Sequence, residues 1–211
     1  MRKISLDLET SGLDSDRHVV LSIGLVDLET GEHFYVELDW EECTVTRKAL
    51  AVNRWNFGNG NVHRMAAHLA ADRANAWVRS RMGDEPAMAL GKNVGFDLEF
   101  IKALFEMCGL ESPFHYRKID LSTLFYSIEE SRGITKDRIV AVAEAKLAGD
   151  KPDVAKLEAH NALYDAWWNV YCYRECMHVI GSAETEYDHP QEQTVQDRVT
   201  AGSAPLIAKG G

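Results

Sequence analysis

The chain has 211 residues, of which 45% are apolar, and it carries a formal net charge of −10 at pH 7. That length is enough for one domain with a substantial core, and no window approaches the roughly 18 consecutive apolar residues that a membrane-spanning helix requires. The excess of acids argues against a protein that coats duplex nucleic acid, because such binding rests on many Lys and Arg contacts with phosphates. It leaves open an enzyme that contacts a few nucleotides through bound cations.

Strand patterns dominate the first forty residues. Residues 3–9 form an apolar run interrupted by acids, and in residues 18–28 Leu and Ile alternate with Ser and Gly. The turn sequence ETGE then leads into residues 33–39. The second and third strands are therefore expected to form a hairpin.

The rest of the chain alternates helix and strand before its composition changes. We predict a helix over residues 62–82, a strand over 87–94, a helix over 95–110, a strand over 115–120, a helix that begins at Asp120 or Ser122, and an aromatic-rich helix over 161–180. This order predicts an α/β fold with a mixed five-stranded sheet, in which antiparallel hairpin strands adjoin parallel strands flanked by helices. Residues 183–211 contain few large apolar side chains and are expected to form a flexible tail.

The N-terminus and the cysteines indicate where the protein works. The opening residues MRKISLDLE carry acids where the apolar core of a secretory signal would stand. The four cysteines do not form zinc-type pairs, and Cys172 and Cys176 lie four residues apart in a helical pattern, which favours core packing. We therefore expect a reduced, cytoplasmic protein with no membrane segment.

Acids stand at several positions where the patterns predict burial. Asp7 and Glu9 are two residues apart on the first strand, so their side chains share one face. Asp97 occupies the apolar face of its helix, and Asp165 occupies the apolar stripe of the last helix. Each has an ordinary alternative, because an edge strand can have a solvated face and an acid at a helix N-terminus can be a cap.

Together these positions favour a metal site. Buried acids cost several kcal/mol unless they are paired or bound to a metal, and four converging carboxylates roughly cancel the charge of two divalent cations. Oxygen ligands favour Mg²⁺ or Mn²⁺ over zinc, and paired cations support phosphodiester hydrolysis. His160, in a loop five residues before Asp165, is a candidate base for an attacking water, although a histidine there can also be a surface or capping residue.

Three motifs carry a resemblance to a known group of enzymes. DLETSGLD (7–14), NVGFDLEFI (93–101) and HNALYDAW (160–167) resemble, in order and spacing, the motifs of the DnaQ-like (DEDDh) 3′→5′ exonuclease superfamily. The resemblance covers residues 3 to about 178 and implies an RNase H-like fold, with an exonuclease domain over residues 1–182. It implies two divalent cations and a general base, His160. The metal ligands that it implies are Asp7, Glu9, Asp97 and Asp165.

The same resemblance implies contacts with the substrate. Thr10 and Leu13 match positions that line the pocket of the terminal nucleotide, Thr10 through its backbone or hydroxyl and Leu13 as an apolar wedge. Asn93 and Phe96 match the Asn and the aromatic residue of the second motif. Thr10 could equally be a turn residue and Phe96 a core residue. Asp120 is interpreted as a structural helix cap.

The leading hypothesis is a metal-dependent exonuclease that releases 5′-mononucleotides from single-stranded 3′ ends of RNA or DNA. GKNVGFD and FHYRKIDLSTL are similar to oligoribonucleases, but residues 40–90 do not match that subfamily. Related exonucleases are dimers, so a homodimer is plausible. The alternatives are a catalytically silent module of the same fold that binds nucleic acid or a polymerase, and an unrelated α/β domain whose acids are caps.

Overall fold

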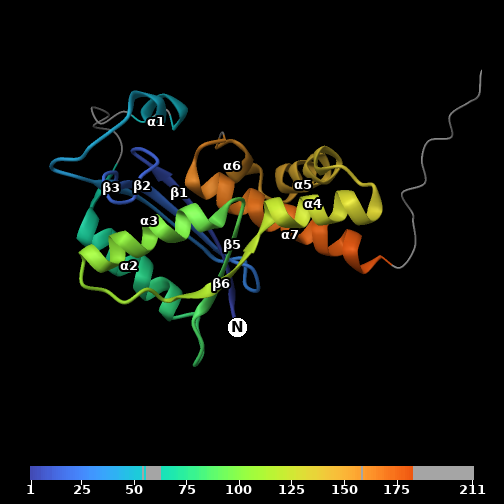
Figure 1. Ribbon diagram of the computed structural model, residues 1–211, viewed down its shortest axis with the longest axis horizontal. Coiled ribbons are helices and arrows are strands. Elements are labelled where there is room, and N and C mark those ends of the chain that lie inside the picture. The colour runs from blue at the N-terminus through green and yellow to red at the C-terminus, as the bar shows by residue number, and fades with distance from the viewer. Residues whose placement is uncertain (54, 56–62, 158, 183–211) are drawn as a thin grey trace, which may run out of the picture. The chain divides into compact units, whose positions relative to one another are not determined.

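The computed structural model describes residues 1–53, 55, 63–157 and 159–182 (Figure 1). Residues Met1–Ile180 form one compact unit. The strands are β1 (Lys3–Thr10), β2 (Val20–Asp27), β3 (His33–Asp39), β4 (Met65–Ala66), β5 (Ala87–Gly91) and β6 (Phe114–Asp120). The helices are α1 (Arg47–Val52), α2 (Ala67–Arg79), α3 (Val94–Met107), α4 (Leu121–Arg132), α5 (Lys136–Asp150), α6 (Pro152–Ala155) and α7 (Ala162–Gly181).

The strands form one mixed sheet in the order β4-β3-β2-β1-β5-β6. β1, β2 and β3 are antiparallel neighbours, whereas β5 runs parallel to β1 and β6 runs parallel to β5. This confirms the predicted mixed sheet with a hairpin on one side and crossover helices on the other. The prediction of five strands missed β4, whose two residues pair with the end of β3 and are too few to show a sequence pattern.

The two faces of β1 carry different side chains because successive residues of a strand point to opposite sides. Ile4, Leu6 and Leu8 are buried in the core beneath α2 and α3. On the other face, the Ser5 hydroxyl donates a 2.8 Å hydrogen bond to the carbonyl of Ala166 in α7. Figure 1 shows α2 and α3 on one side of the sheet and α7 on the other. The sheet is therefore the middle layer, and the face that carries Asp7 is covered by α7.

Several predicted boundaries were wrong, and three helices were missed. The helix predicted over 62–82 begins at Ala67, because Met65 and Ala66 pair with β3; residue 62 lies outside the described residues. The strand predicted over 87–94 ends at Gly91, and Asn93 is already the N-cap of α3. Helices α1, α5 and α6 were not predicted. In α5 the signal was present, since the buried side chains Ile139, Ala143 and Leu147 recur every fourth residue.

Four further expectations concern the end of α3, the cysteines, membrane-spanning helices and the C-terminal tail. Gly109, with φ of 70°, follows the C-cap of α3 and ends that helix as predicted. All four cysteines are free thiols, and Cys172 and Cys176 are buried. No helix among the described residues is long and apolar enough to cross a membrane. The predicted tail, residues 183–211, lies outside the described residues.

Candidate active site

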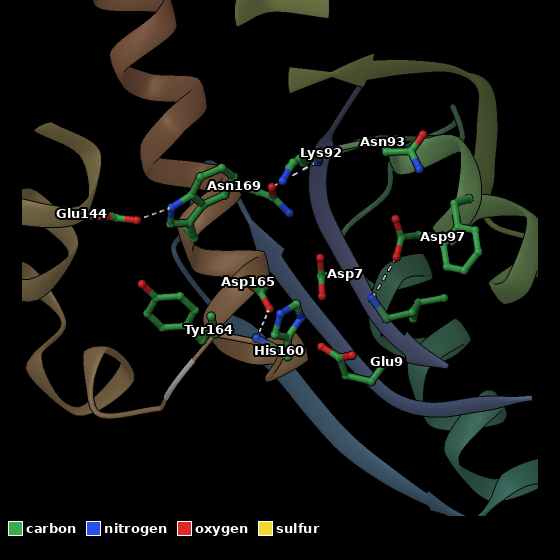
Figure 2. A pocket seen from close by; sticks show the side chains of 14 residues that line it. Asp7, Glu9, Lys92, Asn93, Asp97, Glu144, His160, Tyr164, Asp165 and Asn169 are labelled. Carbon is green, nitrogen blue, oxygen red and sulfur yellow. Dashed lines mark hydrogen bonds between the residues drawn. The ribbon is translucent and has the colours of Figure 1, made fainter. Parts of the chain in front are cut away.

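A cavity of about 450 Å³ opens at the carboxyl ends of β1 and β5 and is bordered by α3 and α7 (Figure 2). In open α/β sheets, ligands bind at the carboxyl-terminal edge of the strands, at a point where the connections that follow two neighbouring strands run in opposite directions. All five predicted catalytic residues line the cavity, and so do two of the four predicted substrate contacts. These residues are Asp7, Glu9, Asp97, His160 and Asp165, with Asn93 and Phe96.

The cavity exists because β1 and β5 separate before β1 ends. Their pairing stops at Ser5 and Leu90. Farther along β1, the backbone N–H of Leu8 donates instead to Asp97 Oδ1, at 3.0 Å. Asp97 lies in the first turn of α3 and is 6% exposed. Its carboxylate thus satisfies a backbone donor that the diverging strand leaves free, and it faces the cavity from the side opposite α7.

Close approach of α7 to the sheet brings Asp165 to the same cavity. Asp7 pairs across the sheet with Gly24 of β2. A Cβ atom on Gly24 would collide with the backbone carbonyl of Ala162, in the first turn of α7. Only glycine allows the helix N-terminus to lie this close to the strand. The sequence shows a glycine inside a strand here, but its role depends on a helix almost 140 residues later.

The carboxylates repel one another at close range. Burial, followed by the charges of Asp97, Asp165 and Glu9, raises the pKa of Asp7 well above its usual range. Burial, followed by the charges of Asp165 and Asp97, raises the pKa of Glu9 to about 8. Burial raises the pKa of Asp97 to about 7, against the hydrogen bond from Leu8. The Lys92 ammonium lowers the pKa of Asp7 and Asp165 but leaves both raised overall. The charge of Lys92 therefore does not offset the charges of the four carboxylates.

This donor set fits divalent cations. Glu9, Asp165 and His160 each offer a ligand atom, and these atoms lie within 4.8 Å of one another. Asp7 projects from β1 between them and Asp97 (Figure 2). Carboxylate oxygens are hard ligands of the kind that Mg²⁺ and Mn²⁺ prefer. The acids and the histidine together form a possible metal site.

Two cavity residues have unusual backbone conformations. Asn93 and His160, with φ of 55° and 65°, are the non-glycine residues with positive φ within the described part of the chain. Such conformations cost energy and cluster at functional sites. The backbone N–H of His160 donates to Asp165 Oδ2, at 2.8 Å, and that of Asn93 donates to Asp120 Oδ1, at 3.1 Å. Each strained residue is thus held by an acid in or beside the cavity.

A second cavity of about 520 Å³ adjoins the first, and Leu8, Glu9 and Phe96 line both. The predicted contacts Thr10 and Leu13 line this second cavity. Leu13 is 80% exposed, as a wedge against a base would be. Thr10 is buried, and its hydroxyl donates to the Gly12 carbonyl at 2.7 Å.

Sequence reasoning missed the far wall of this second cavity. It is formed by α1 and its flanking residues, from Thr46 to Asn53. The amide of Asn53 donates to the backbone carbonyl of Thr10 at 2.9 Å, and this bond ties α1 to the end of β1. A six-residue helix with no buried side chains leaves little pattern in a sequence.

Comparison with known families decides the wider identity. The family described as "3′-5′ exoribonuclease Rv2179c-like domain" matches residues 2–177, which include every residue of the cavity. The chain belongs to this family. The exonuclease is therefore a hydrolase, and its resemblance to DnaQ-like enzymes is confirmed.

Individual relatives include nucleases of RNA and of DNA. The exonuclease is 25% identical to the 3′-5′ DNA exonuclease Cap18 of Escherichia coli, over 81% of this chain and 89% of that protein. It is 28% identical to ribonuclease T of Vibrio campbellii, over 77% of this chain and 78% of that protein. It is 26% identical to the oligoribonuclease of Aeromonas hydrophila, over 56% of this chain and 70% of that protein.

Solved structures share the fold. Exonuclease I of E. coli in complex with a dA16 oligonucleotide superposes with a TM-score of 0.62 at 15% identity, over 84% of this chain and 41% of that one. The zinc-bound form of its complex with single-stranded DNA superposes equally well, with a TM-score of 0.62 at 14% identity, over 85% and 41%. The chain thus spans about two fifths of the length of these neighbours.

Proposed function

We propose that the protein is a metal-dependent 3′→5′ exonuclease that hydrolyses single-stranded RNA or DNA from its 3′ end and releases 5′-mononucleotides. The observation that carries the proposal is the group of buried and half-buried, mutually repelling carboxylates around one cavity, where Lys92 is the one Lys or Arg among the described lining residues. Such a group needs external positive charge. Membership of an exonuclease family supports the reaction, and the arrangement of the acids supports the cofactor.

In this proposal the four carboxylates hold two Mg²⁺ or Mn²⁺ ions. Bound divalent cations would supply charge that stabilises the attacking and leaving oxygens of a phosphodiester displacement. Asp7 and Glu9 reach the site from one face of β1, Asp97 from α3 and Asp165 from α7. Because three separate elements contribute ligands, the site is complete only when the whole domain is folded.

His160 acts as the general base. It accepts a proton from a water molecule as that oxygen bonds to phosphorus, and the bond from phosphorus to the 3′ oxygen of the preceding nucleotide breaks. The products are a free 3′-hydroxyl and a 5′-mononucleotide. The backbone bond to Asp165 fixes the position from which the imidazole works.

The terminal nucleotide occupies the second cavity. Leu13 and Phe96, which line this cavity, contact its base, and Thr10 contributes its backbone or hydroxyl. Asn93 contributes a polar group from the adjoining first cavity. The named relatives act on DNA in one case and RNA in others, so both polymers belong in the test. A homodimer and a cytoplasmic location stay predictions.

The decisive experiment is a gel time course with 5′-labelled single strands of DNA and RNA, at several lengths, with Mn²⁺ or with EDTA. We expect a ladder that descends from the 3′ end only with metal, and the polymer degraded faster is the preferred substrate. Absence of a ladder from every strand, with Mn²⁺ binding demonstrated by calorimetry, would favour a silent binding module.

The role of His160 has its own test. His160→Ala is expected to lower the rate by about 10²–10⁴-fold and to leave Mn²⁺ affinity nearly unchanged. Calorimetric titration of the variant with Mn²⁺ separates a base from a ligand, because His160 also lies within metal-binding reach of Glu9 and Asp165. Wild-type activity would exclude it as the base, and a large loss of affinity would make it a ligand.

A further inference from the structure

The proposed mechanism leaves one wall of the first cavity without a role. This wall, which we call the Trp168 wall, consists of Lys92, Trp168 and Asn169, with Glu144 and Tyr164 behind them. Lys92 and Asn169 lie on the opposite side of Asp7 from Glu9, which also lines the second cavity (Figure 2). Its residues come from the end of β5, from α5 and from α7.

Asn169 carries a polar group that lacks a partner. Its side chain is 1% exposed, and its Oδ1 accepts the backbone N–H of Lys92 at 3.1 Å. That bond fixes the orientation of the amide, since only the oxygen can accept. Its Nδ2 group has no hydrogen-bond partner among the described residues. A buried unpaired donor is costly, and one that lines a cavity is ready for an acceptor on a ligand.

Trp168 presents a fixed aromatic surface beside this donor. Its indole N–H donates to Glu144 Oε1 at 3.2 Å, and its ring meets Phe125 edge-on, with centroids 6.4 Å apart. These two contacts hold the ring, which is half-buried and lines the cavity. A preorganised aromatic face is what proteins use to stack single-stranded bases.

Lys92 adds the positive charge. Its ammonium lies 6.0 Å from the centroid of the Trp168 ring. It lines the same cavity as Asp7 and Asp165, so its charge lies near the carboxylates where the reacting phosphate would lie. The wall therefore combines a stacking surface, an amide donor and a cation, which match the base and the phosphate of one nucleotide.

We propose that Lys92, Trp168 and Asn169 form the subsite of the nucleotide on the 5′ side of the scissile bond. Trp168 stacks on its base, while Lys92 and Asn169 hold the phosphate that joins it to the terminal nucleotide. This inference rests on the proposed exonuclease function and extends it by a second base-recognition site. Stacking gives little base preference, so the subsite selects a strand of at least two nucleotides rather than a sequence.

Stacking is tested by removing the Trp168 ring and the penultimate base, first singly and then together, as in a double-mutant cycle. Wild type and Trp168→Ala are compared on a short 5′-labelled strand and on the same strand with an abasic site at the penultimate position. We expect Trp168→Ala to lower kcat/KM for the first cut by about 5- to 100-fold on the intact strand. For wild type, kcat/KM on the abasic strand should be lower than on the intact strand by the same factor. On the abasic strand, Trp168→Ala should lower kcat/KM little further. Trp168→Phe, which keeps a stacking surface, should restore most of the rate.

The test of the phosphate contacts is binding under non-cleaving conditions. Anisotropy of a labelled strand is measured in Ca²⁺ at several salt concentrations, with a gel to show that the strand stays intact. Lys92→Gln should weaken binding and reduce the salt slope by about 0.7. Asn169→Ala should weaken binding without changing that slope. Lys102→Gln is the matched control, because Lys102 is an exposed lysine on α3 outside both cavities.

The outcomes separate the subsite from the exonuclease function. Equal losses for Trp168→Ala on intact and abasic strands, or coupling only to an abasic site at the terminal position, would overturn the subsite. An unchanged salt slope for Lys92→Gln would remove its phosphate role. If wild type makes no metal-dependent cut, the exonuclease proposal fails. Anisotropy in Ca²⁺ of wild type and Trp168→Ala with intact and abasic strands then still decides whether Trp168 stacks on a base.

Discussion

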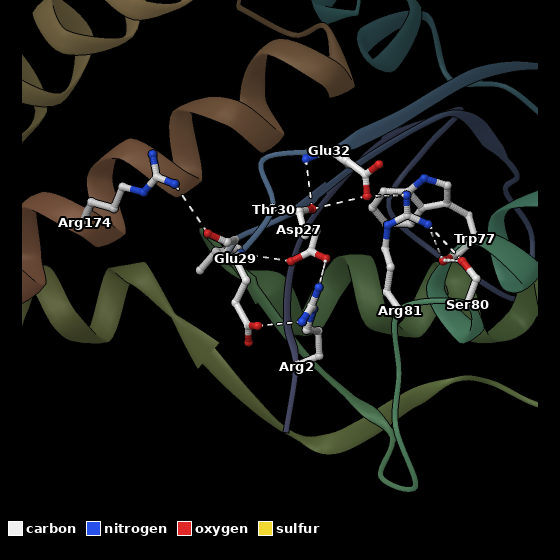
Figure 3. A network of polar contacts seen from close by, with 10 residues as sticks. Arg2, Asp27, Glu29, Thr30, Glu32, Trp77, Ser80, Arg81 and Arg174 are labelled. Atoms are coloured by element: carbon white, nitrogen blue, oxygen red, sulfur yellow. Dashed lines mark hydrogen bonds and ion pairs between the residues drawn. The ribbon is translucent and has the colours of Figure 1, made fainter.

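Acids with opposite surroundings lie at the two ends of the same pair of strands. Asp7 and Glu9 face the cavity at the carboxyl end of β1, whereas Asp27 closes β2 opposite Ile4, at the other end (Figure 3). Asp27 is fully buried, yet two Arg2 nitrogens contact its Oδ2 at 3.0 and 2.9 Å, and the Glu29 backbone N–H donates to its Oδ1 at 2.9 Å.

The electrostatic outcomes are opposite. Burial would raise the pKa of Asp27, but the hydrogen bonds from Glu29 and Arg2 outweigh it and lower the pKa overall. In the cavity, burial and neighbouring acids act in the same direction, and the pKa of Glu9 rises to about 8. Burial alone thus does not distinguish a structural acid from a functional one. The distinction is whether the chain itself supplies the counter-charge.

The largest expected difference is in catalysis. Asp7→Asn removes a proposed metal ligand and with it several kcal/mol of transition-state stabilisation, so kcat/KM should fall on the order of 10³-fold or more. Asp27→Asn, at the far end of the sheet, should retain near-wild-type activity wherever it is folded. Initial rates on a labelled single strand in Mn²⁺ measure both. Comparable losses in the two variants would mean that Asp7 acts through the fold.

The next difference is in stability without metal. In EDTA at pH 8, Asp27→Asn should lower the free energy of unfolding by about 1–3 kcal/mol, because charge-assisted hydrogen bonds are lost. Asp7→Asn should raise it on the order of 1 kcal/mol, because one buried charge among like charges is removed. Urea unfolding followed by circular dichroism gives both signs. A destabilised Asp7→Asn variant would show that the chain pairs Asp7 structurally.

The pH dependence sharpens the same contrast. The folded-state pKa of Glu9 is raised from 4.5 to about 8, and that of Asp97 from 3.8 to about 7. The folded protein therefore binds more protons than the unfolded chain in this window, and its stability in EDTA should fall as pH rises from about 4 to 8. Asp27, with a lowered pKa, has the opposite sign and loses its contribution at acidic pH. Melting temperatures across pH 4–9 test this.

Measuring the pH profile with Mn²⁺ and with two variants shows whether the decline comes from the acids of the cavity. Saturating Mn²⁺ should remove most of the decline toward pH 8, because bound cations favour the ionised carboxylates. Asp7→Asn should flatten the decline in EDTA, whereas Asp27→Asn should leave it in place. A decline that Mn²⁺ and Asp7→Asn both leave unchanged would locate its source outside the cavity.

Sequence reasoning reached the acids of the cavity but not the groups that arrange them. The four acids could be identified because each stands at a position where the local apolar pattern predicts a buried residue. They are Asp7, Glu9, Asp97 and Asp165. Gly24 and Asn169 were not identified, because their roles depend on contacts with Ala162 and Lys92, which lie far from them in the chain. Long-range contacts of this kind leave no periodicity.

The fold shows a similar division. The strands and the longer helices follow from alternation and apolar stripes. The strand β4 and the helix α1, with two and six residues, are stabilised by tertiary contacts such as the bond from Asn53 to Thr10 rather than by a pattern of their own. Of these two short elements, α1 borders the second cavity, and it is the part of the site that sequence reasoning describes least well.

The smallest expected effects concern Asp120, which lies beside the cavity and yet resembles Asp27. Its carboxylate accepts from the Ser122 backbone N–H at 2.9 Å as the N-cap of α4, and from Asn93 N–H at 3.1 Å. The sequence interpretation of Asp120 as a cap is thus confirmed. Asp120→Ala should cost about 1 kcal/mol of stability, and Asp120→Asn only a few tenths (~0.3 kcal/mol), since asparagine caps as well as aspartate.

The activity of these two variants completes the contrast. Asp120→Asn keeps an acceptor for the strained backbone of Asn93, so its kcat should stay close to that of wild type, whereas Asp120→Ala releases Asn93 and should raise KM. Steady-state kinetics of both variants in Mn²⁺ measure the difference. If Asp120→Asn lost activity as severely as Asp7→Asn, the charge of Asp120 would be required, and the metal site would extend to a fifth carboxylate.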